Sequence, residues 1–361
     1  MTSSVSLDEA QLALGLAPDL LAVRSQWNAL AERSGNLFST WEWAYVWWRH
    51  FGTGGRPLPI VCRDEGGKVV AILPLYLYAR RPIRIARFMG HGVADQLGPV
   101  CEPENIRAAE ALARSGRDGP LRWDLLLAER LPAGGAWERS LGGRALNHES
   151  SPIVNIEGLS WEAYLASRSP NFRSQLRRKE RNLVREHGLV YRLGDDPERL
   201  REDMETLFSL HHARWQAESV ALAGRRTAFH HEFAELALQR GWLRLWLAQV
   251  RGRTVAAWYG FRFAGAEWYY QAGRDPAWDR SSIGLVLLAH TLREAINDGI
   301  REYKLLRGGE AFKFRFASGD LPVVSVAVPR GALGHAAAGA GAAALSLPRW
   351  ARRAVTRAVG N

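Results

Sequence analysis

The second half of the chain changes its hydrophobic pattern near residue 242. Before that point the pattern predicts a short strand followed by helices, at 153–156, 161–167, 171–187, 199–218 and 225–239. After it, β-branched and aromatic residues between turn residues predict strands, a helix and a last strand, at 242–250, 254–263, 266–273, 283–297 and 301–306. Gly299 directly follows the predicted helix and suits a left-handed C-terminal cap.

The first half shows a looser version of this order. Helices come first, then strands, then one more helix and strand, at 20–33, 41–51, 58–62, 69–78, 105–115 and 123–129. A short repeat supports a duplication, because Gly-Lys-Val-Val-Ala-Ile at 67–72 resembles Gly-Arg-Thr-Val-Ala-Ala at 252–257. At 361 residues the chain is also longer than one core usually supports.

Two α/β domains are therefore predicted, at 15–150 and 151–328, with the boundary in the glycine- and proline-containing segment Leu131–Pro152. The remaining residues, 329–361, are rich in alanine and glycine and end in a short basic stretch. We expect this tail to be disordered, because alanine and glycine bury too little surface to offset the entropy of ordering. Its arginines leave open a second interpretation, an amphipathic helix in peripheral contact with anionic lipid.

Charge and cysteine content narrow the class of protein. The formal charge is +11, which favours anionic ligands, anionic membrane surfaces or nucleic acid without choosing among them. Cys62 and Cys101 are the only cysteines and form no CxxC pair, so we expect no metal site and a reducing compartment. Neither a signal peptide nor an apolar stretch of about 18 residues is evident, so the predicted location is the cytoplasm, with the inner face of the membrane as the extension that the tail suggests.

A basic loop enters the helix predicted at 283–297 with almost no spacer. It carries Arg280, Ser281, Ser282 and Gly284, and Arg274 lies at the end of the preceding strand. The first N–H groups of a helix have no intrahelical partner, and the helix dipole favours negative charge there. The loop therefore predicts a site for a phosphate-bearing ligand, with an ordinary capped helix as the alternative.

The order of strands, loop and helix resembles the GCN-related N-acetyltransferase (GNAT) superfamily, most closely its tandem CelD/BioF-type branch, which is related to the FemAB-like aminoacyl transferases. The segments that carry the resemblance lie at 171–183, 210–215, 241–263, 269–288 and 305–316, with looser matches at 41–48, 69–76 and 90–100. It implies two tandem GNAT-like domains, each a central mixed sheet flanked by helices. The first domain has no basic glycine loop, so one donor site is expected, in the second domain.

The resemblance implies acetyl-CoA or a longer acyl-CoA as the donor and no metal. The donor's pyrophosphate would lie at the basic loop, and its pantetheine arm between the strand ending near Gly273 and the strand starting near Ile300. The implied donor-binding residues are Arg274, Arg280, Ser281, Ser282, Ile283 and Gly284. The chain departs from the family pattern in two places: Ser282 stands where the first glycine is expected, and Phe312 where relatives commonly carry tyrosine.

Acyl transfer to an amine needs a base, a polarised carbonyl and a proton for the leaving thiolate. Glu310 is the candidate base, and Lys313 the candidate for stabilising the oxyanion or holding an anionic acceptor. Proton delivery is left to Tyr269, Tyr270 or water. His211 is a second candidate base, because an imidazole titrates near neutral pH. A surface ion pair and a packed histidine are the structural alternatives.

The acceptor is expected to be an anionic compound that bears an amine, such as a nucleotide-sugar or a lipid-linked phosphate. Arg173, Arg177 and Arg181 recur at four-residue spacing on one predicted helix and are retained despite their mutual repulsion. Asp95, in the first half, is a further candidate for acceptor binding. A solvated basic helix face is the alternative interpretation.

The predicted function is therefore an N-acyltransferase that moves an acyl group from acyl-CoA to an amine acceptor. An amino sugar or an intermediate of envelope or exopolysaccharide synthesis is the acceptor that the resemblance suggests. Two alternatives stay open: a FemAB-like transferase that uses aminoacyl-tRNA, and a non-catalytic module of polysaccharide biosynthesis that keeps only the fold.

Overall fold

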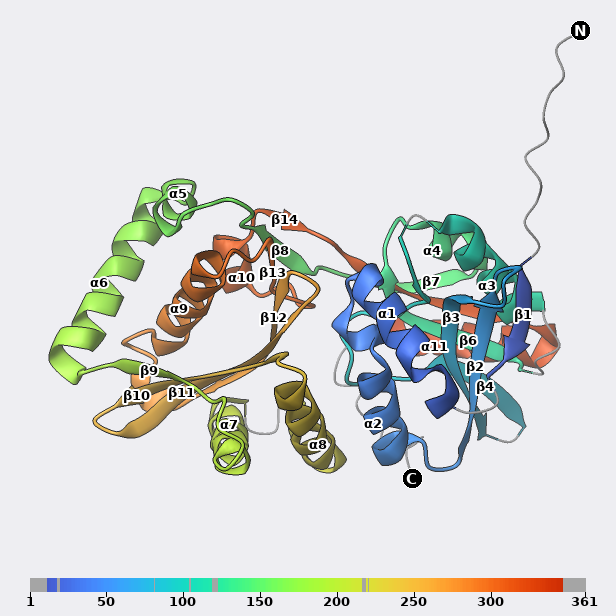
Figure 1. Ribbon diagram of the computed structural model, residues 1–361, viewed down its shortest axis with the longest axis horizontal. Helices are drawn as coiled ribbons and strands as arrows, with labels where there is room; N and C mark the ends of the chain where they lie inside the picture. Colours follow the sequence, from blue (N-terminus) through green and yellow to red (C-terminus); the bar gives the residue numbers. More distant parts are fainter. Residues whose placement is uncertain are drawn as a thin grey trace, which may run out of the picture. The chain divides into compact units, whose positions relative to one another are not determined.

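The computed structural model of the chain describes residues 12–17, 20–80, 82–103, 105–118, 123–215, 219 and 221–346. Its contacts form two compact units. The first unit takes the described residues of 12–45, 52–148 and 324–346, and the second takes 46–51 and 149–323 apart from the few undescribed positions. Each unit holds one sheet with flanking helices (Figure 1).

The first unit is built on an eight-stranded sheet with the order β1-β2-β3-β4-β6-β15-β7, and β5 pairs with β3. Its strands are β1 (Ala13–Leu16), β2 (Gly55–Arg63), β3 (Val69–Arg80), β4 (Ile83–Phe88), β5 (Val100–Cys101), β6 (Leu125–Pro132), β7 (Arg144–Glu149) and β15 (Val323–Pro329). Its helices are α1 (Arg24–Ser34), α3 (Ile106–Asp118), α4 (Ala136–Leu141) and α11 (Gly331–Ser346). Helix α2 (Trp41–Phe51) is divided, with 41–45 in the first unit and 46–51 in the second. Strands β1 to β4 are antiparallel neighbours, whereas β4 and β6 run parallel.

The end of the chain differs from the predicted boundary at residue 328. Residues 323–329 form β15, which lies between β6 and β7 in the first sheet. Six of its seven residues are buried, as expected for a strand inside a sheet that is covered on both faces. The apolar run Val-Val-Ser-Val-Ala-Val therefore returns the chain to the first unit.

The segment expected to be disordered begins as a helix. Residues 331–346 form α11, while 347–361 lie outside the described residues. A Cβ atom at Gly334 would come within 1.9 Å of the Asp124 carbonyl oxygen, so the missing side chain lets α11 lie directly against the chain entering β6. Backbone proximity, which composition does not encode, orders this part of the tail.

The second unit holds a seven-stranded mixed sheet with the order β14-β8-β13-β12-β11-β10-β9. Its strands are β8 (Pro152–Asn155), β9 (Val190–Leu193), β10 (Leu243–Val250), β11 (Arg253–Phe263), β12 (Ala266–Arg274), β13 (Glu302–Lys304) and β14 (Gly319–Asp320). Its helices are α5 (Trp161–Ala166), α6 (Pro170–His187), α7 (Leu200–Trp215), α8 (Arg225–Gln239), α9 (Ile283–Asn297) and α10 (Ala311–Phe316). Helices α7 and α8 cover one face, and α6, α9 and α10 lie on the other (Figure 1).

Helix α7 approaches β12 unusually closely at Gly273. A Cβ atom there would lie 2.3 Å from the backbone nitrogen of His211, so only glycine fits. This contact fixes the C-terminal end of α7 beside the end of β12. It therefore brings the motif at 210–215 to the strand that precedes the basic loop.

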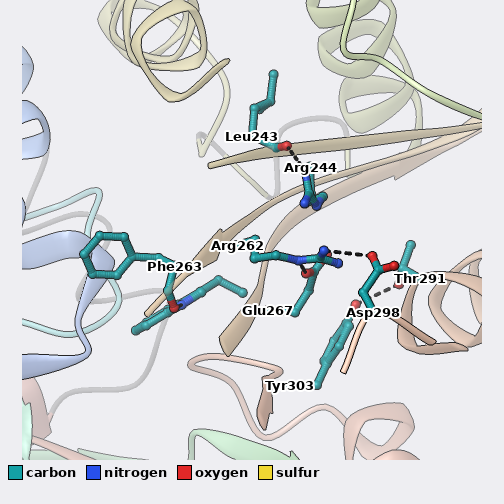
Figure 2. A network of polar contacts seen from close by, with 9 residues as sticks. Leu243, Arg244, Arg262, Phe263, Glu267, Thr291, Asp298 and Tyr303 are labelled. Atoms are coloured by element: carbon teal, nitrogen blue, oxygen red, sulfur yellow. Dashed lines mark hydrogen bonds and ion pairs between the residues drawn. The ribbon is translucent and has the colours of Figure 1, made fainter. Parts of the chain in front are cut away.

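An ion-pair network around the buried Glu267 holds together the opposite end of the same sheet. Arg262 donates to Glu267 at 2.8 Å and to Asp298 at 2.7 Å, which ties β11, β12 and the end of α9 together (Figure 2). Nearby, the Tyr303 and Thr291 hydroxyls lie 2.7 Å apart (Figure 2). Burial raises the pKa of Glu267 to about 7, and the Arg262 charge opposes this shift.

Candidate functional site

The edge of β12 opens toward its C-terminal end. The parallel ladder with β13 joins only 266–268 to 302–304, while β12 itself continues to Arg274. Backbone groups of 269–274 therefore lie beyond the end of this ladder. This matches the expected divergence of the two strands, and it leaves backbone donors and acceptors along which an extended ligand can bind.

A β-bulge interrupts the pairing of β12 with β11 at the same place. Gly260 pairs with Tyr269 and Tyr259 pairs with Gln271, which leaves Tyr270 as the extra residue. The bulge separates the two tyrosines. Tyr269 lies toward Phe312 of α10, whereas Tyr270 packs among His230, Tyr259 and Phe261 on the α8 side.

A cavity of about 250 Å³ lies at this open edge. Its wall combines the end of β12, part of β11, the first turns of α9, two residues of α10 and single residues of α6 and α7. The lining residues are Gln175, Arg214, Ala257, Trp258, Tyr269, Ala272, Gly273, Arg274, Asp279, Ser282, Gly284, Leu285, Leu287, Leu288, Phe312 and Arg315. One part is aromatic and aliphatic, and the other is cationic, so the cavity suits a ligand with an apolar arm and anionic groups.

The loop at the start of α9 keeps a glycine-like backbone despite its serine. Ser282, the N-cap residue, has φ 59° and ψ 39°, in the left-handed region that favours glycine. The Ser282 carbonyl accepts from Leu285 and Val286, but across the described residues no acceptor pairs with the N–H groups of Ile283 and Gly284. Two free N–H groups at a helix mouth, with strain retained at their cap, form an anion-binding arrangement.

Three arginines contribute positive charge to the cavity. Arg274 lies against Gly284 and its Nε donates to Asp279. Arg315 donates to Gln175 and lies 4.8 Å from the Phe172 ring centre. Arg214 stacks on the neighbouring Trp215 at 4.4 Å. Within the described part of the chain, neither Arg214 nor Arg315 forms an ion pair with a carboxylate, so the cavity carries uncompensated positive charge.

Arg214 and Tyr269 interact inside the cavity. Burial lowers the pKa of Arg214, and the Arg274 charge lowers it further. Burial raises the pKa of Tyr269, while the Arg214 guanidinium opposes this through its charge and a hydrogen bond. Arg274 also lowers this pKa, and Glu310 raises it.

Lys313 and Glu310 lie together next to the cavity and are not among its lining residues. The buried Lys313 ammonium donates to the carbonyls of Arg307 at 2.7 Å and Leu306 at 3.3 Å, and lies 3.1 Å from Glu310. Leu306 has φ 58° and Gly308 has φ 128°, so the lysine fastens a strained turn after β13. This geometry gives Lys313 a structural contact, and its predicted catalytic role stays a prediction.

His211 also lies away from the cavity. It is buried where α7 crosses β12, with Nε2 at 3.5 Å from the Ser219 hydroxyl. Burial lowers its pKa to about 4, and the Arg214 charge adds to this. The imidazole is therefore neutral at physiological pH. The predicted bases and acids thus lie in two places, Glu310 and Lys313 beyond β13, and His211 and Tyr270 on the α7–α8 face.

Some of the predicted donor-binding residues line the cavity, whereas the other predicted binding residues lie elsewhere. Of the six donor residues, Arg274, Ser282 and Gly284 line the cavity, while Arg280, Ser281 and Ile283 do not. On α6, Arg173 caps the preceding helix through the carbonyls of Ala166 and Arg168, whereas Arg177 and Arg181 are exposed.

Asp95 belongs to the first unit, in the loop after β4. Its predicted role in acceptor binding stays a prediction.

Sequence reasoning missed two of the cavity's arginines. Arg214 lies three residues after His211, within the LHHARW segment that carried the resemblance, and Arg315 lies three residues after Phe312. Both spacings place a residue on the same side of a helix as a residue already singled out. That spacing is the signal that identifies them.

Comparison with known proteins defines the class. Residues 170–314 match the model of the acetyltransferase (GNAT) domain family. A search of curated proteins finds no significant match. Among solved structures, FemX is similar over 85% of this chain and 96% of its own, with TM-score 0.62 and 11% identity.

Two further structures share the fold. One is assigned as the C-terminal domain of a lysylphosphatidylglycerol synthetase from Agrobacterium fabrum, with 13% identity, coverage of 91% and 97%, and TM-score 0.57. The other is L-PGS from Bacillus licheniformis, with 13% identity, coverage of 87% and 93%, and TM-score 0.50.

The second unit thus carries, over residues 170–314, a match to the GNAT domain family. The predicted tandem GNAT, FemX-like fold is confirmed, since the likeness to FemX spans both units. No metal-binding group of His, Cys, Asp or Glu occurs among the residues with assigned structure. None of the described helices is long and apolar enough to cross a membrane.

Proposed function

We propose that the protein transfers an acyl group from a phosphate-bearing thioester, acetyl-CoA or a longer acyl-CoA, to an amine. The observation that carries this proposal is the cavity at the open edge of β12, where an apolar channel meets uncompensated arginines and a free helix N-terminus. A thioester supplies an activated carbonyl and a thiolate leaving group. The residues around the cavity fit both parts of such a donor.

The cationic part of the cavity would bind the donor's phosphates. Arg274 and Arg315 offer charge-assisted hydrogen bonds, and the N–H groups of Ile283 and Gly284 point out of the start of α9. The left-handed Ser282 turns the loop so that these groups are available. Arg280 and Ser281, on the outer side of the loop, would contact the donor where it leaves the cavity.

The apolar part would hold the arm and the acyl group. Trp258, Leu287 and Phe312 exclude water, which strengthens every polar interaction inside. Backbone groups of 269–272, beyond the β13 ladder, would hydrogen-bond the arm and polarise the thioester carbonyl. Glu310, 46% exposed at its side chain, stays the proposed base for the incoming amine, and Lys313 sets its position.

The acceptor is proposed to be an anionic amine, such as an amino sugar carried on a nucleotide or lipid phosphate. The exposed arginines of α6, Arg177 and Arg181, and Asp95 are the proposed contacts. Envelope or exopolysaccharide synthesis is the process in which we place it, and action in the cytoplasm is proposed accordingly.

A second candidate is transfer of an aminoacyl group from tRNA. The likeness to FemX, L-PGS and a lysylphosphatidylglycerol synthetase domain favours it, as do four exposed arginines on α6 with no ion-pair partner among the described residues. These arginines are Arg177, Arg178, Arg181 and Arg185. RNA binding through them would depend steeply on salt.

A thermal-shift screen with acetyl-CoA, longer acyl-CoAs and CoA tests the donor. We expect stabilisation by at least one of these compounds and its loss in Arg274→Ala. The matched control is Arg225→Ala, an exposed arginine on α8. A shift with aminoacyl-tRNA alone favours the second candidate. If a thioester stabilises the protein but no amine tested is acylated and no CoA is released, the protein is a binding module that keeps only the fold.

A further inference from the structure

The cavity contains a group suited to protonating a leaving thiolate. Among the described lining residues Tyr269 is the one with a phenol, and it lies at the bulge of β12. Its ring centre is 6.5 Å from that of Phe312 and 6.0 Å from that of Trp258. The ring therefore belongs to the aromatic part of the cavity, and its hydroxyl lies within reach of the charges of Arg214, Arg274 and Glu310.

Arg214 holds this hydroxyl. Helix α7 ends at Trp215, beside the end of β12, because Gly273 lets the two backbones meet. From there the guanidinium reaches the cavity that Tyr269 also lines, stacks on Trp215 and acts on the Tyr269 hydroxyl through its charge. A cation next to a phenol stabilises its deprotonated form, so it makes the phenol a better proton donor.

We propose that Tyr269 is the general acid of the acyl transfer and that Arg214 is the residue that positions it. This inference rests on the proposed function, since it assigns a proton source to that reaction. It concerns only the leaving group. Donor binding and the identity of the acceptor are independent of it.

The step balances as follows. The amine nitrogen bonds to the thioester carbonyl carbon, and the C–S bond breaks with its electron pair on sulfur. The Tyr269 hydroxyl gives its proton to the thiolate, and the phenolate is stabilised by Arg214. The proton lost by the amine then returns to Tyr269, so no proton is gained or lost overall.

The other candidate acids either form hydrogen bonds and ion pairs elsewhere or lie on the opposite side of the strand. The Lys313 ammonium donates to two backbone carbonyls and pairs with Glu310. Tyr270 faces His230 and Tyr259 on the opposite side of the bulge. The charged groups that face Tyr269 are Arg214, Arg274 and Glu310, from α7, β12 and the chain before α10.

The hydroxyl can be moved to test the assignment. Phe312 lies in the same cavity against Tyr269, so Phe312→Tyr places a phenol nearby. Four proteins are compared under single-turnover conditions with an acyl-CoA and an amine: wild type, Tyr269→Phe, Phe312→Tyr and the double variant. We expect Tyr269→Phe to slow transfer about 100-fold, within the range of general acid catalysis, with donor Kd unchanged within threefold.

The double variant is expected to transfer the acyl group at least tenfold faster than Tyr269→Phe alone. Arg214→Met should also slow transfer and should shift to higher pH the alkaline limb expected of the wild-type rate, whereas Arg214→Lys should recover part of the rate. Tyr191→Phe is the matched control. Its buried hydroxyl has no partner among the described residues and lies outside the cavity lining, so its rate should be unchanged.

The outcomes distinguish failure of the Tyr269 assignment from failure of the proposed acyl-transfer function. If the wild type transfers the acyl group and Tyr269→Phe keeps its rate within threefold, Tyr269 is not the acid while the proposed function stands. If Tyr269→Phe is slow but the double variant recovers nothing, the tyrosine acts through packing and the inference is overturned. If the wild type neither binds nor transfers any thioester, the proposed function and this inference fall together.

Discussion

The two ends of the second sheet compensate partly buried arginines in opposite ways. At the end formed by β11, β12 and the last turn of α9, Arg262 is paired with both Glu267 and Asp298 (Figure 2). At the other end of β12, Arg214 and Arg315 line a cavity with no carboxylate partner in the described part of the chain, and Arg274 is paired only with Asp279.

This difference distinguishes charge that supports the fold from charge kept for a ligand. Removing an arginine from water is costly unless an anion compensates it. The protein supplies the anions at the first end. At the cavity end they would come from the ligand, which is why we place the donor's phosphates there.

The largest expected effect is at the paired end. Arg262→Met should lower the free energy of unfolding by about 3–5 kcal/mol at pH 8, because the buried Glu267 loses the charge that compensates its carboxylate. Denaturant titration at pH 8 and pH 5 measures it, and the loss should be smaller at pH 5, where Glu267 takes up a proton. A loss below 1 kcal/mol at pH 8 would remove the distinction between the two ends.

Glu267 should make this end sensitive to pH. Its pKa is raised from 4.5 to about 7, so its stabilising contribution is complete below pH 4.5 and is lost as pH rises through 7. Relative to Glu267→Gln, the wild type should lose about 2–3 kcal/mol between pH 5 and pH 8. Parallel denaturation curves for the two proteins across this range would contradict the shift.

At the cavity end, substitution of an arginine should weaken ligand binding and leave the stability of the fold nearly unchanged. Arg315→Met should weaken binding of an acyl-CoA by about 10- to 100-fold, the value of a charge-assisted hydrogen bond. Its free energy of unfolding should change by less than about 1 kcal/mol, because no buried carboxylate loses a partner. Calorimetric titration and denaturation of the same preparation check both parts.

The smallest effect is expected at the strained cap. Ser282→Gly should stabilise the protein by up to about 1 kcal/mol, because glycine adopts the left-handed conformation without strain. Donor affinity should stay within twofold, since the backbone N–H groups are unchanged. Destabilisation, or loss of binding, would instead assign a role to the serine side chain.

Local pattern was sufficient to predict much of the second unit. The predicted strands at 242–250, 254–263 and 266–273 correspond to β10, β11 and β12, and the predicted helix at 283–297 is α9. Strong alternation and clear turn residues make these elements legible in the sequence. The loop before α9 was recognised for the same reason, since its residues are contiguous.

The remainder depends on contacts between distant residues. Nothing in residues 323–329 indicates which sheet they join, and the six-residue α10 is too short for its pattern to be read. The cavity assembles Gln175, Arg214 and Arg315 from three helices, so their proximity is a property of packing. The choice between Tyr269 and Tyr270 likewise depends on packing, because only Tyr269 is among the cavity's lining residues.

The central claim is that Arg274 and Arg315 of the cavity bind the phosphates of a thioester donor. It is tested most directly by calorimetric titration of an acyl-CoA into the wild type and into Arg274→Met/Arg315→Met, with the fold checked by circular dichroism. The account predicts saturable one-to-one binding by the wild type and a Kd at least 100-fold higher in the double variant. Equal affinities for a well-folded double variant, or no binding of acyl-CoA by the wild type, would contradict it.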